Sequence, residues 1–553
     1  MSHELSNEIA SKNSTFLIKH QLVALCILVL CVFFLRVWQI THTEVAARDS
    51  IGFIRYAWAL ENTSDWKSLV KGAHQHPGFP VSIYIFSVPV RFFVSSDLPL
   101  AFQISSQLSA SFFSVLLVIP LFVIGREIFN AKVGFWAVIL FEFLPASSKV
   151  LGDGLSEGMF LFFAAASLAL VLLGFKSQRQ GKNIQIELWF FAGLAAAASY
   201  LVRPEGMILF LATALVLTLF ILIAKFPTHL QRMKQGFNFL GLVLGFSLLA
   251  LPFILTIGKL TTKPTGQRIL EHTSVFKPQV ETRLALLPKH NHVLVLLDQP
   301  PLFASWWEGD DQSQAARFLW SFLVLGDSYL KGLNYLGCLF AFVGLVLTPR
   351  ETWKSPEMIV LVLSFFILNV VFFRVALVMG YLSERHAMLA LMLIVLWVSF
   401  GAVTLGDRIV LFFENSALGF LFGKLNQISF LLLILILPSL WKNLETLHYN
   451  REGFKQAGKW IAENTNPGDI VEDPFCWSHY FAGRVFLEGK VDLKTSVPSA
   501  KFVVVERSAN PHFRLQTQDE ETLKAQDGKA VFEWVCSRKG LKSSVLVYAV
   551  PLR

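Results

Sequence analysis

Long apolar runs, separated by short polar loops, constrain the fold of this chain more than any other feature. The runs begin near Leu22 and recur to about residue 441, and many approach the ~20 residues that cross a bilayer as a helix. Charged residues make up only 16% of the chain, against about 25% in soluble domains. We therefore expect a mostly α-helical, polytopic membrane protein.

Basic residues mark the loops that set its orientation. They gather in four short loops, at residues 125–133, 174–187, 225–236 and 348–357, which the positive-inside rule places in the cytoplasm. This orientation predicts about eleven crossings, over residues 20–38, 98–124, 133–150, 156–174, 188–202, 206–224, 237–257, 332–348, 358–378, 387–405 and 427–441. Residues 81–95 are too short a run, interrupted by Pro89 and Arg91, and should lie on the outer surface or re-enter it.

The crossings divide the chain into segments. Residues 1–19 form a cytoplasmic tail, 20–260 a first transmembrane module with an outer loop at 39–97, 261–331 an outer loop and juxtamembrane segment, and 332–441 the remaining transmembrane helices. The character then changes, with an amphipathic helix at 453–464, a turn at 466–468 followed by a strand, and β-branched strands at 502–506 and 544–550. Residues 445–553 should form a small extracytoplasmic α/β domain.

Ionisable residues at the outer ends of the apolar runs are the main indication of a function. They are Glu44, Arg48, Asp49, His76, Asp153, Glu157, Arg203, Glu205, Glu384, Arg385 and His386. A charged side chain next to a membrane segment costs free energy unless it lies at the aqueous boundary, so such charges often have a functional role. Their concentration on one side favours a site over ordinary solvated loops.

Asp49 is the foremost candidate. A carboxylate just outside the first span can accept a proton from a hydroxyl, or it can cap a helix that starts at Ser50. The patterned segment that follows, which includes Tyr56, predicts an amphipathic helix on the membrane surface. Asp153 and Glu157 lie four residues apart, so both can share one face at the start of a helix or favour its dipole.

Arginines and a histidine at the outer ends of the apolar runs have the chemistry of a phosphate-binding site. Arg203 can bind one or pair with Glu205, and Arg385 with His386 can form a phosphate clamp or extend toward lipid headgroups. His76-Pro77 suits a rigid turn. Metal ligation with His74 stays open, so a divalent metal is possible although no third ligand has a clear spacing. Residues 259–315 suit either a substrate-covering lid or an interfacial aromatic and basic belt.

Several motifs together resemble a known family. In order they read ARDSIGFIRYA, HPGFP, GREIF, LPASSKVLGDGLSEGMF and GLAAAASYLVRPEG. The chain resembles the C-type (GT-C) glycosyltransferases, in the branch of the protein O-mannosyltransferases and the lipid A aminoarabinose transferase. The resemblance covers residues 20–260 and, more weakly, 384–386. It departs from the family pattern in reading HPG rather than HPP and in having Arg48 before the acid, which leaves the acceptor and any metal requirement open.

The resemblance implies a GT-C helical bundle in the cell membrane, with its active site and C-terminus extracytoplasmic. The donor would be a sugar on a polyprenyl phosphate, and transfer would invert the anomeric centre. Asp49 would be the base, Asp153 the second acid, and Arg203 and Arg385 the phosphate ligands. The candidate substrate-binding residues are then Glu44, Arg48, Tyr56, His76, Asp153, Glu157, Arg203, Glu205, Arg385 and His386.

Other functions remain open at this point. A transporter or flippase of a lipid-linked sugar would place charges midway along its spans, in paired halves, whereas here they sit at the outer ends. An oligosaccharide polymerase or ligase would share the outer-face site. The acceptor can be a lipid, a glycan or a protein, and membrane lipids surround the helices. Nucleic acid is not expected, because much of the +9 net charge lies in topology-setting loops.

Overall fold

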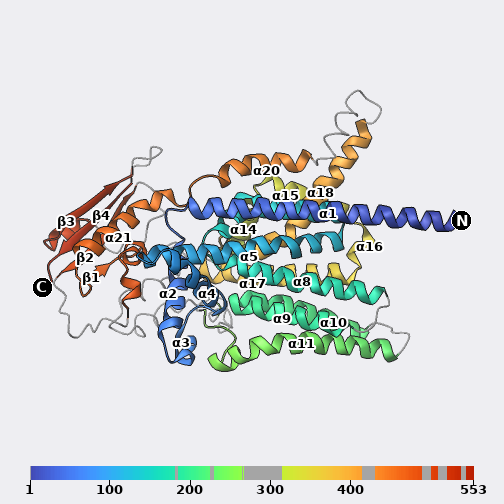
Figure 1. The fold of residues 1–553 in the computed structure, drawn as a ribbon, viewed down its shortest axis with the longest axis horizontal. Coiled ribbons are helices and arrows are strands. Elements are labelled where there is room, and N and C mark those ends of the chain that lie inside the picture. The colour runs from blue at the N-terminus through green and yellow to red at the C-terminus, as the bar shows by residue number, and fades with distance from the viewer. Residues whose placement is uncertain are drawn as a thin grey trace.

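A computed structural model of the chain describes residues 2–180, 185–223, 229–263, 266, 314–413, 430–488, 500–508, 520–536 and 543–552. Its main body is a helical bundle, and a small sheet domain lies beyond one end of that bundle (Figure 1). The N-terminus of α1 projects from the opposite end.

Helices of membrane-spanning length form the bundle. Among the described residues, seven are long and apolar enough to cross a membrane, or up to nine if each of two bent pairs counts as one span. The seven lie within α1 (Ser2–Thr41), α5 (Leu98–Ile128), α8 (Glu157–Arg179), η1 (Pro204–Gly206) with α10 (Met207–Ile223), α11 (His229–Ile257), α17 (Pro356–Met379) and α18 (Met388–Phe413). A multi-pass membrane protein is confirmed.

The bent pairs and two shorter helices account for the remaining expected crossings. α6 (Ala131–Phe143) and α7 (Pro145–Gly152) meet at 67°, and α14 (Gln314–Gly332) and α15 (Leu336–Leu347) meet at 100°. The short helix α16 (Arg350–Trp353) follows α15. The expected crossings at 188–202 and 427–441 fall on α9 (Ile186–Val202) and α20 (Phe430–Asn443), which are apolar but shorter.

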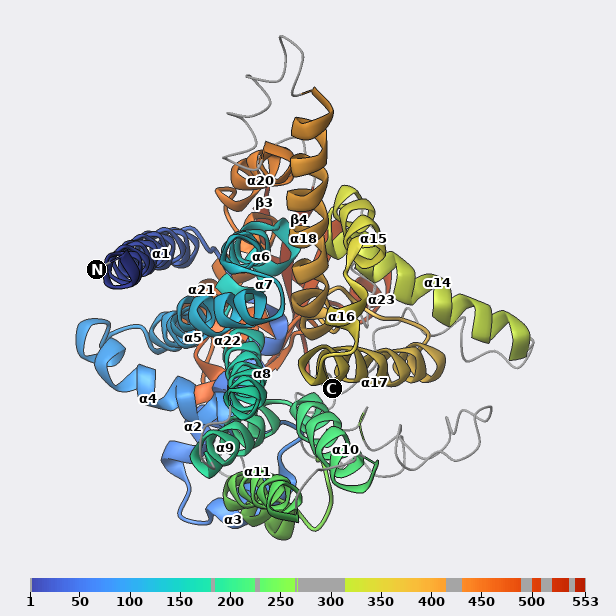
Figure 2. The same ribbon diagram turned by 90° about the vertical axis from the view of Figure 1, so that its right-hand side faces the viewer.

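Close helix contacts hold the bundle together. A Cβ on Gly193 of α9 would collide with the Leu242 carbonyl of α11, and one on Gly245 would collide with the Phe190 carbonyl. Glycine at such crossings lets two backbones approach and pack without a hydrophobic driving force. α8 packs against α5, α9, α17 and α18, and Figure 2 shows it between α5 and α9 when the helices are viewed nearly end-on.

Three short helices cover the end of the bundle next to the sheet domain: α2 (Arg48–Asn62), α3 (Trp66–Gly72) and α4 (Gly78–Phe93) (Figure 1). α4 buries Phe79, Ile83 and Val90 but exposes Ile85 and Phe92. At 16 residues it is not among the helices long enough to span. α9 and α20 are of the same shorter class, so length does not test the expectation that residues 81–95 do not cross, which stays a prediction.

The C-terminal residues form the expected α/β unit. It comprises η3 (Tyr449–Arg451), α21 (Glu452–Asn464), β1 (Ile470–Glu472), α22 (Trp477–Phe481), η4 (Arg484–Phe486), β2 (Lys501–Ser508), α23 (Glu520–Ala525), β3 (Lys529–Val535) and β4 (Ser543–Val550). The four-stranded sheet has the order β1-β2-β4-β3. β1 pairs with β2 in parallel, and the other pairs are antiparallel. The mostly α class with a small α/β domain is confirmed, and β3 is a strand that the sequence analysis did not predict.

A buried ion pair, also not anticipated, ties α1 to α6. Arg36 binds Glu142, and the two side chains are 1% and 0% exposed. Arg36 also donates from Nε to Ser114 Oγ of α5 at 3.0 Å and from Nη1 to the Ser148 carbonyl of α7 at 2.9 Å. These bonds join four helices near the end of the bundle that carries α2.

Candidate active site at the end of the helical bundle

Helix α2 places Asp49 at the end of the bundle next to the sheet domain. Its inner face buries Ile51, Phe53 and Ile54, so the first turn is fixed while the Asp49 side chain stays 60% exposed. The helix begins at Arg48 with Ala47 as the N-cap. The alternative that Asp49 caps a helix starting at Ser50 is therefore wrong, because Asp49 already lies inside the first turn.

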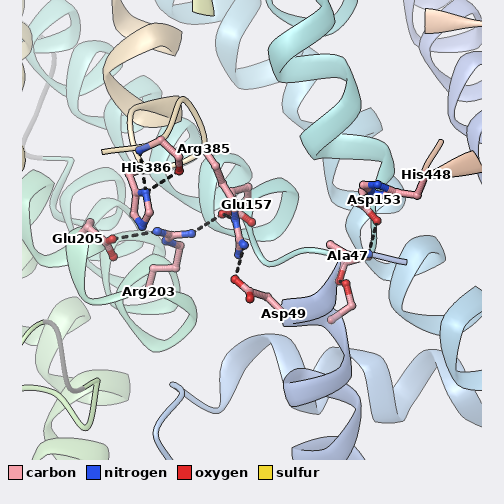
Figure 3. Close-up of polar contacts among 12 residues, drawn as sticks. Ala47, Asp49, Asp153, Glu157, Arg203, Glu205, Arg385, His386 and His448 are labelled. Carbon is pink, nitrogen blue, oxygen red and sulfur yellow. Dashed lines mark hydrogen bonds and ion pairs between the residues drawn. The ribbon is translucent and has the colours of Figure 1, made fainter. Parts of the chain in front are cut away.

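Arg385 bridges two acidic residues. Its Nη1 donates to Asp49 Oδ2 at 2.5 Å, and its Nε donates to Glu157 Oε1 (Figure 3). Arg385 precedes α18, whereas Asp49 and Glu157 belong to α2 and α8. A planar guanidinium with donors in a fixed fork can bind both carboxylates at once. Residues far apart in the sequence are thus brought to one point.

Arg203 extends this cluster. It caps the end of α9, where its Nη1 binds Glu157 Oε1 at 2.5 Å and its Nη2 binds Glu205 Oε1 at 3.0 Å. Its guanidinium also lies over the Phe160 ring, 5.6 Å from the centroid. Pro204 starts the next helical turn, as expected. Arg203 therefore pairs with Glu205, as one alternative held, and with Glu157 as well.

A small pocket opens among these side chains. It is lined by Glu157, Phe160, Arg203, Glu205, Phe372, Arg385, His386, Met388 and Leu389. Within the described residues, three buried polar atoms here lack a hydrogen-bond partner: Glu157 Oε2, Arg203 Nε and Glu205 Oε2. Buried polar atoms are nearly always bonded, so these atoms are available to a ligand or to water.

The charges around the pocket act on one another. The surrounding protein disfavours charge on Asp49, but Arg385, Arg48 and His386 outweigh it, so the pKa of Asp49 lies below its usual value. Burial lowers the pKa of Arg385, but Glu157 and Asp49 more than compensate and raise it. Burial, then Arg203 and Arg385, lower the pKa of His386 to about 4. At neutral pH Asp49 and Arg385 are ionised and His386 is neutral.

Lys263 lies close enough to this site to interact electrostatically with Arg203, Glu205 and Glu157, although its sequence position indicates only a long outer loop. Burial, together with the nearby Arg203, lowers the pKa of Lys263 to about 8, while Glu205 opposes this. The only available signal was its position just beyond a span, which many loop lysines share. The loop predicted as a lid or belt lies largely outside the described residues.

Asp153 lies apart from this cluster. Its Oδ1 accepts the Ala47 N–H at 2.8 Å, and its Oδ2 contacts His448 Nε2 at 2.7 Å (Figure 3). α8 begins only at Glu157, and Asp153 precedes it as the residue that ends α7. The prediction that Asp153 and Glu157 share one helix face is therefore wrong. His448, the partner of Asp153, was missed because nothing in its local sequence marks it.

Other candidates hold the scaffold around the site. His76 is buried between the Tyr200 carbonyl at 2.7 Å and Thr261 Oγ1 at 2.9 Å, and burial lowers its pKa to about 4. Tyr56 is buried in an apolar cluster with Tyr200. The Glu44 N–H donates to the Leu447 carbonyl at 3.2 Å. None of these contacts reaches the Asp49–Arg385 pair.

Arg48 lies beside Cys476 of the C-terminal domain. It also adds to the positive charge around Asp49.

The donor set does not fit a metal. In the described part of the chain, no three His, Cys, Asp or Glu side chains are grouped so as to hold an ion. The carboxylates of Asp49 and Glu157 are instead neutralised by the guanidinium that lies between them. The arrangement can bind an anionic group and accept a proton.

Comparison with solved structures identifies the fold. No protein-family model and no curated protein sequence match the chain. Among solved structures, ArnT from Cupriavidus metallidurans bound to undecaprenyl phosphate aligns with a TM-score of 0.53 and 11% identity, over 96% of this chain and 97% of that one.

The archaeal oligosaccharyltransferase AglB from Archaeoglobus fulgidus, in complex with an inhibitory peptide and a dolichol-phosphate, aligns with a TM-score of 0.51 and 16% identity. The alignment covers 84% of this chain and 60% of that one. The apo form of the Archaeoglobus fulgidus oligosaccharyltransferase aligns with a TM-score of 0.54 and 13% identity, over 84% and 64% of the two chains. This chain thus spans less than two thirds of the archaeal enzymes. It has the GT-C fold, as its motifs predicted.

Proposed function

We propose that this chain is an integral membrane glycosyltransferase. It transfers a sugar from a polyprenyl-phosphate donor to a lipid, glycan or protein acceptor on the outer face of the cell membrane. The observation that carries the proposal is the exposed Asp49 carboxylate bound by Arg385, next to a pocket that Arg203 also lines. Two structures with this fold contain undecaprenyl phosphate or dolichol-phosphate, which supports the donor class.

The cations of the site suit the donor phosphate. Arginine binds phosphate through two parallel hydrogen bonds, and Arg203 Nε has no partner within the described residues. Lys263 adds a compact charge on the same side. These groups would hold the ground-state phosphate and stabilise the negative charge that grows on it as the sugar departs.

Asp49 suits the role of base. The acceptor hydroxyl attacks the anomeric carbon, the bond from that carbon to the phosphate oxygen breaks, and polyprenyl phosphate leaves with the bonding electrons. Asp49 takes the proton of the hydroxyl. A single displacement of this kind inverts the anomeric centre. The lowered pKa of Asp49 keeps it ionised at neutral pH, and no step is assigned to a metal.

The placement of charges supports the orientation. The site and the C-terminal domain share one end of the bundle, while α16 and the C-terminal end of α8 lie at the other (Figure 1). The second end carries the basic loops with Arg126, Lys176, Arg179 and Arg350, which favour the cytoplasm. The site and the C-terminus would then be extracytoplasmic.

The decisive experiment replaces Asp49 by Asn. Purified protein in liposomes is given a radiolabelled polyprenyl-phosphate sugar and a membrane extract as acceptor, and both label transfer and release of polyprenyl phosphate are measured. Asp49→Asn should lower transfer by about 100- to 10,000-fold. Glu61→Gln is the matched control, because Glu61 lies on the same helix and pairs with Arg91 at its surface, away from Asp49 and Arg385. Unchanged transfer by Asp49→Asn would exclude Asp49 as the base, and substrate flux without transfer would favour the transporter alternative.

A further inference from the structure

Helix α2 carries Asp49, but its N-terminus has no side-chain cap. Its N-cap is Ala47, which has no side chain able to cap the helix. Two other bonds tie the start of the helix to the loop before α8. Asp153 Oδ1 accepts the Ala47 N–H at 2.8 Å, and Ser50 Oγ donates to the Gly154 carbonyl at 2.8 Å. The position of the first turn therefore depends on a distant segment.

The loop that supplies these bonds is itself closely packed. A Cβ on Gly152 would collide with Gln39 of α1, and a Cβ on Gly154 would lie 2.5 Å from Ser106 Oγ and 3.2 Å from Ser50 Oγ. Only glycine permits the backbone to lie this close to α1, α2 and α5. The flanking glycines therefore hold Asp153 in one place relative to α2.

The C-terminal domain also bonds to the residues that lead into α2. Residues 42–47, just before α2, run beside Leu447: the Leu447 N–H donates to the His42 carbonyl at 2.9 Å, and Thr43 and Leu447 form a parallel bridge. Trp477 Nε1 donates to the Ala46 carbonyl at 3.0 Å. The chain entering α2 is thus bonded to residues about 400 positions later.

His448 links the C-terminal domain to Asp153 in the loop before α8. Its Nε2 lies 2.7 Å from Asp153 Oδ2, and a carboxylate can only accept this bond. The Asp153 side chain is 4% exposed and that of His448 is 9% exposed, so water does not replace the contact. One carboxylate thereby connects the C-terminal domain to the amide at the start of α2.

We propose that Asp153 and His448 are positioning residues that hold Asp49 in register for proton transfer, so that the C-terminal domain acts as a clamp on the active site. This rests on the proposed function. Neither residue bonds to Arg203, Arg385 or Glu157, so the clamp acts on the base and not on the phosphate site. A displacement of about 1 Å in a reacting group can lower the rate ~100-fold, which makes such a clamp consequential.

Four variants test the clamp by turnover: Asp153→Ala, Asp153→Asn, His448→Ala and His448→Gln. Both alanine variants should lower kcat by about 10- to 100-fold and leave the KM for the donor within about twofold. Asn and Gln should restore most of the rate, since an amide can still accept from Ala47 or donate to Asp153. An Asp153→Asn variant as inactive as Asp153→Ala would overturn the proposal, because it would assign the carboxylate charge to the chemistry. The proposal would also be overturned if the alanine variants lost kcat and donor affinity equally, or if they lost neither.

A second measurement does not depend on activity. Hydrogen exchange of the amides at residues 47–52 should speed up in both alanine variants, while exchange in the interior of α5 stays as in the wild type. Unchanged exchange at 47–52 would refute the clamp even where turnover falls. If the wild type shows no transfer but the exchange pattern is as expected, the proposed function fails and the clamp stands.

Discussion

Two arginine–carboxylate clusters lie near the same end of the bundle, and they differ in what surrounds them. Every guanidinium nitrogen of Arg36 donates a hydrogen bond: Nε to Ser114, Nη1 to Gln39 and Ser148, and Nη2 to Glu142. Neither charged side chain is more than 1% exposed. Around Arg385, the guanidinium is 23% exposed and holds an Asp49 that is 60% exposed.

The difference separates a structural role from a chemical one. The sealed cluster leaves only Glu142 Oε1 without a partner within the described residues, whereas the open one leaves Glu157 Oε2, Arg203 Nε and Glu205 Oε2. A sealed network whose guanidinium nitrogens are all bonded offers no donor to a ligand and locks four helices together. An unsaturated network beside a pocket can bind a substrate, which is why residue type alone does not identify a site.

The largest effect should come from breaking the sealed cluster. Arg36→Met leaves Glu142 buried without its counter-charge, which typically costs about 3–5 kcal/mol. We expect a strongly lowered melting temperature in detergent. The double variant Arg36→Met with Glu142→Leu should recover much of this loss, because no charge is then left unpaired. A single variant as stable as the wild type would show that this cluster does not lock the helices.

A matched pair of substitutions sharpens the contrast. Arg385→Lys keeps the charge but loses the fork that binds Asp49 and Glu157 together, so kcat/KM should fall by about 10- to 100-fold with a small change in melting temperature. Arg36→Lys should do the reverse, lowering the melting temperature while the folded fraction keeps its turnover. The same pattern of losses in both variants would contradict the division of roles.

The smallest effect should appear in the pH dependence of stability. His76 is buried and its pKa falls to about 4, below the ~6.5 of an unfolded histidine. Between these values the unfolded state binds more protons, so stability decreases as pH falls from about 6.5 toward 4, by at most ~1.4 kcal/mol per pH unit for this group. His76→Gln should flatten the melting temperature in this window, whereas an unchanged slope would assign it to another group such as His386.

Local sequence was enough to predict most helices and the type of fold. The long apolar runs became the helices of the bundle, and the amphipathic pattern at 453–464 became α21. β2 and β4 followed from β-branched residues, but β3 did not, because its segment carries charged and exposed residues along an edge of the sheet. Periodicity reports which residues are buried on a regular element, and an exposed edge strand gives little of that signal.

The partners within the site could not be predicted in the same way. Spacing suggested that Asp153 and Glu157 act together, yet one faces His448 and the other faces Arg203 and Arg385. The break between α7 and α8 separates them, and no local pattern specifies which distant residue lies opposite each. The gathering of ionisable residues on one side was apparent from charge patterning, whereas their pairing required tertiary structure.

The bridge between Thr43 and Leu447 also has a consequence for biosynthesis. A ribosome makes α1 long before it makes α20, and residues 42–46 lack their bonds to Leu447 and Trp477 until the residues after α20 have been translated. A polypeptide released early would therefore hold the start of α2 through the bundle and the loop before α8, without the bonds that the C-terminal domain adds. On the proposed function, full activity is then deferred until the C-terminal domain has been made.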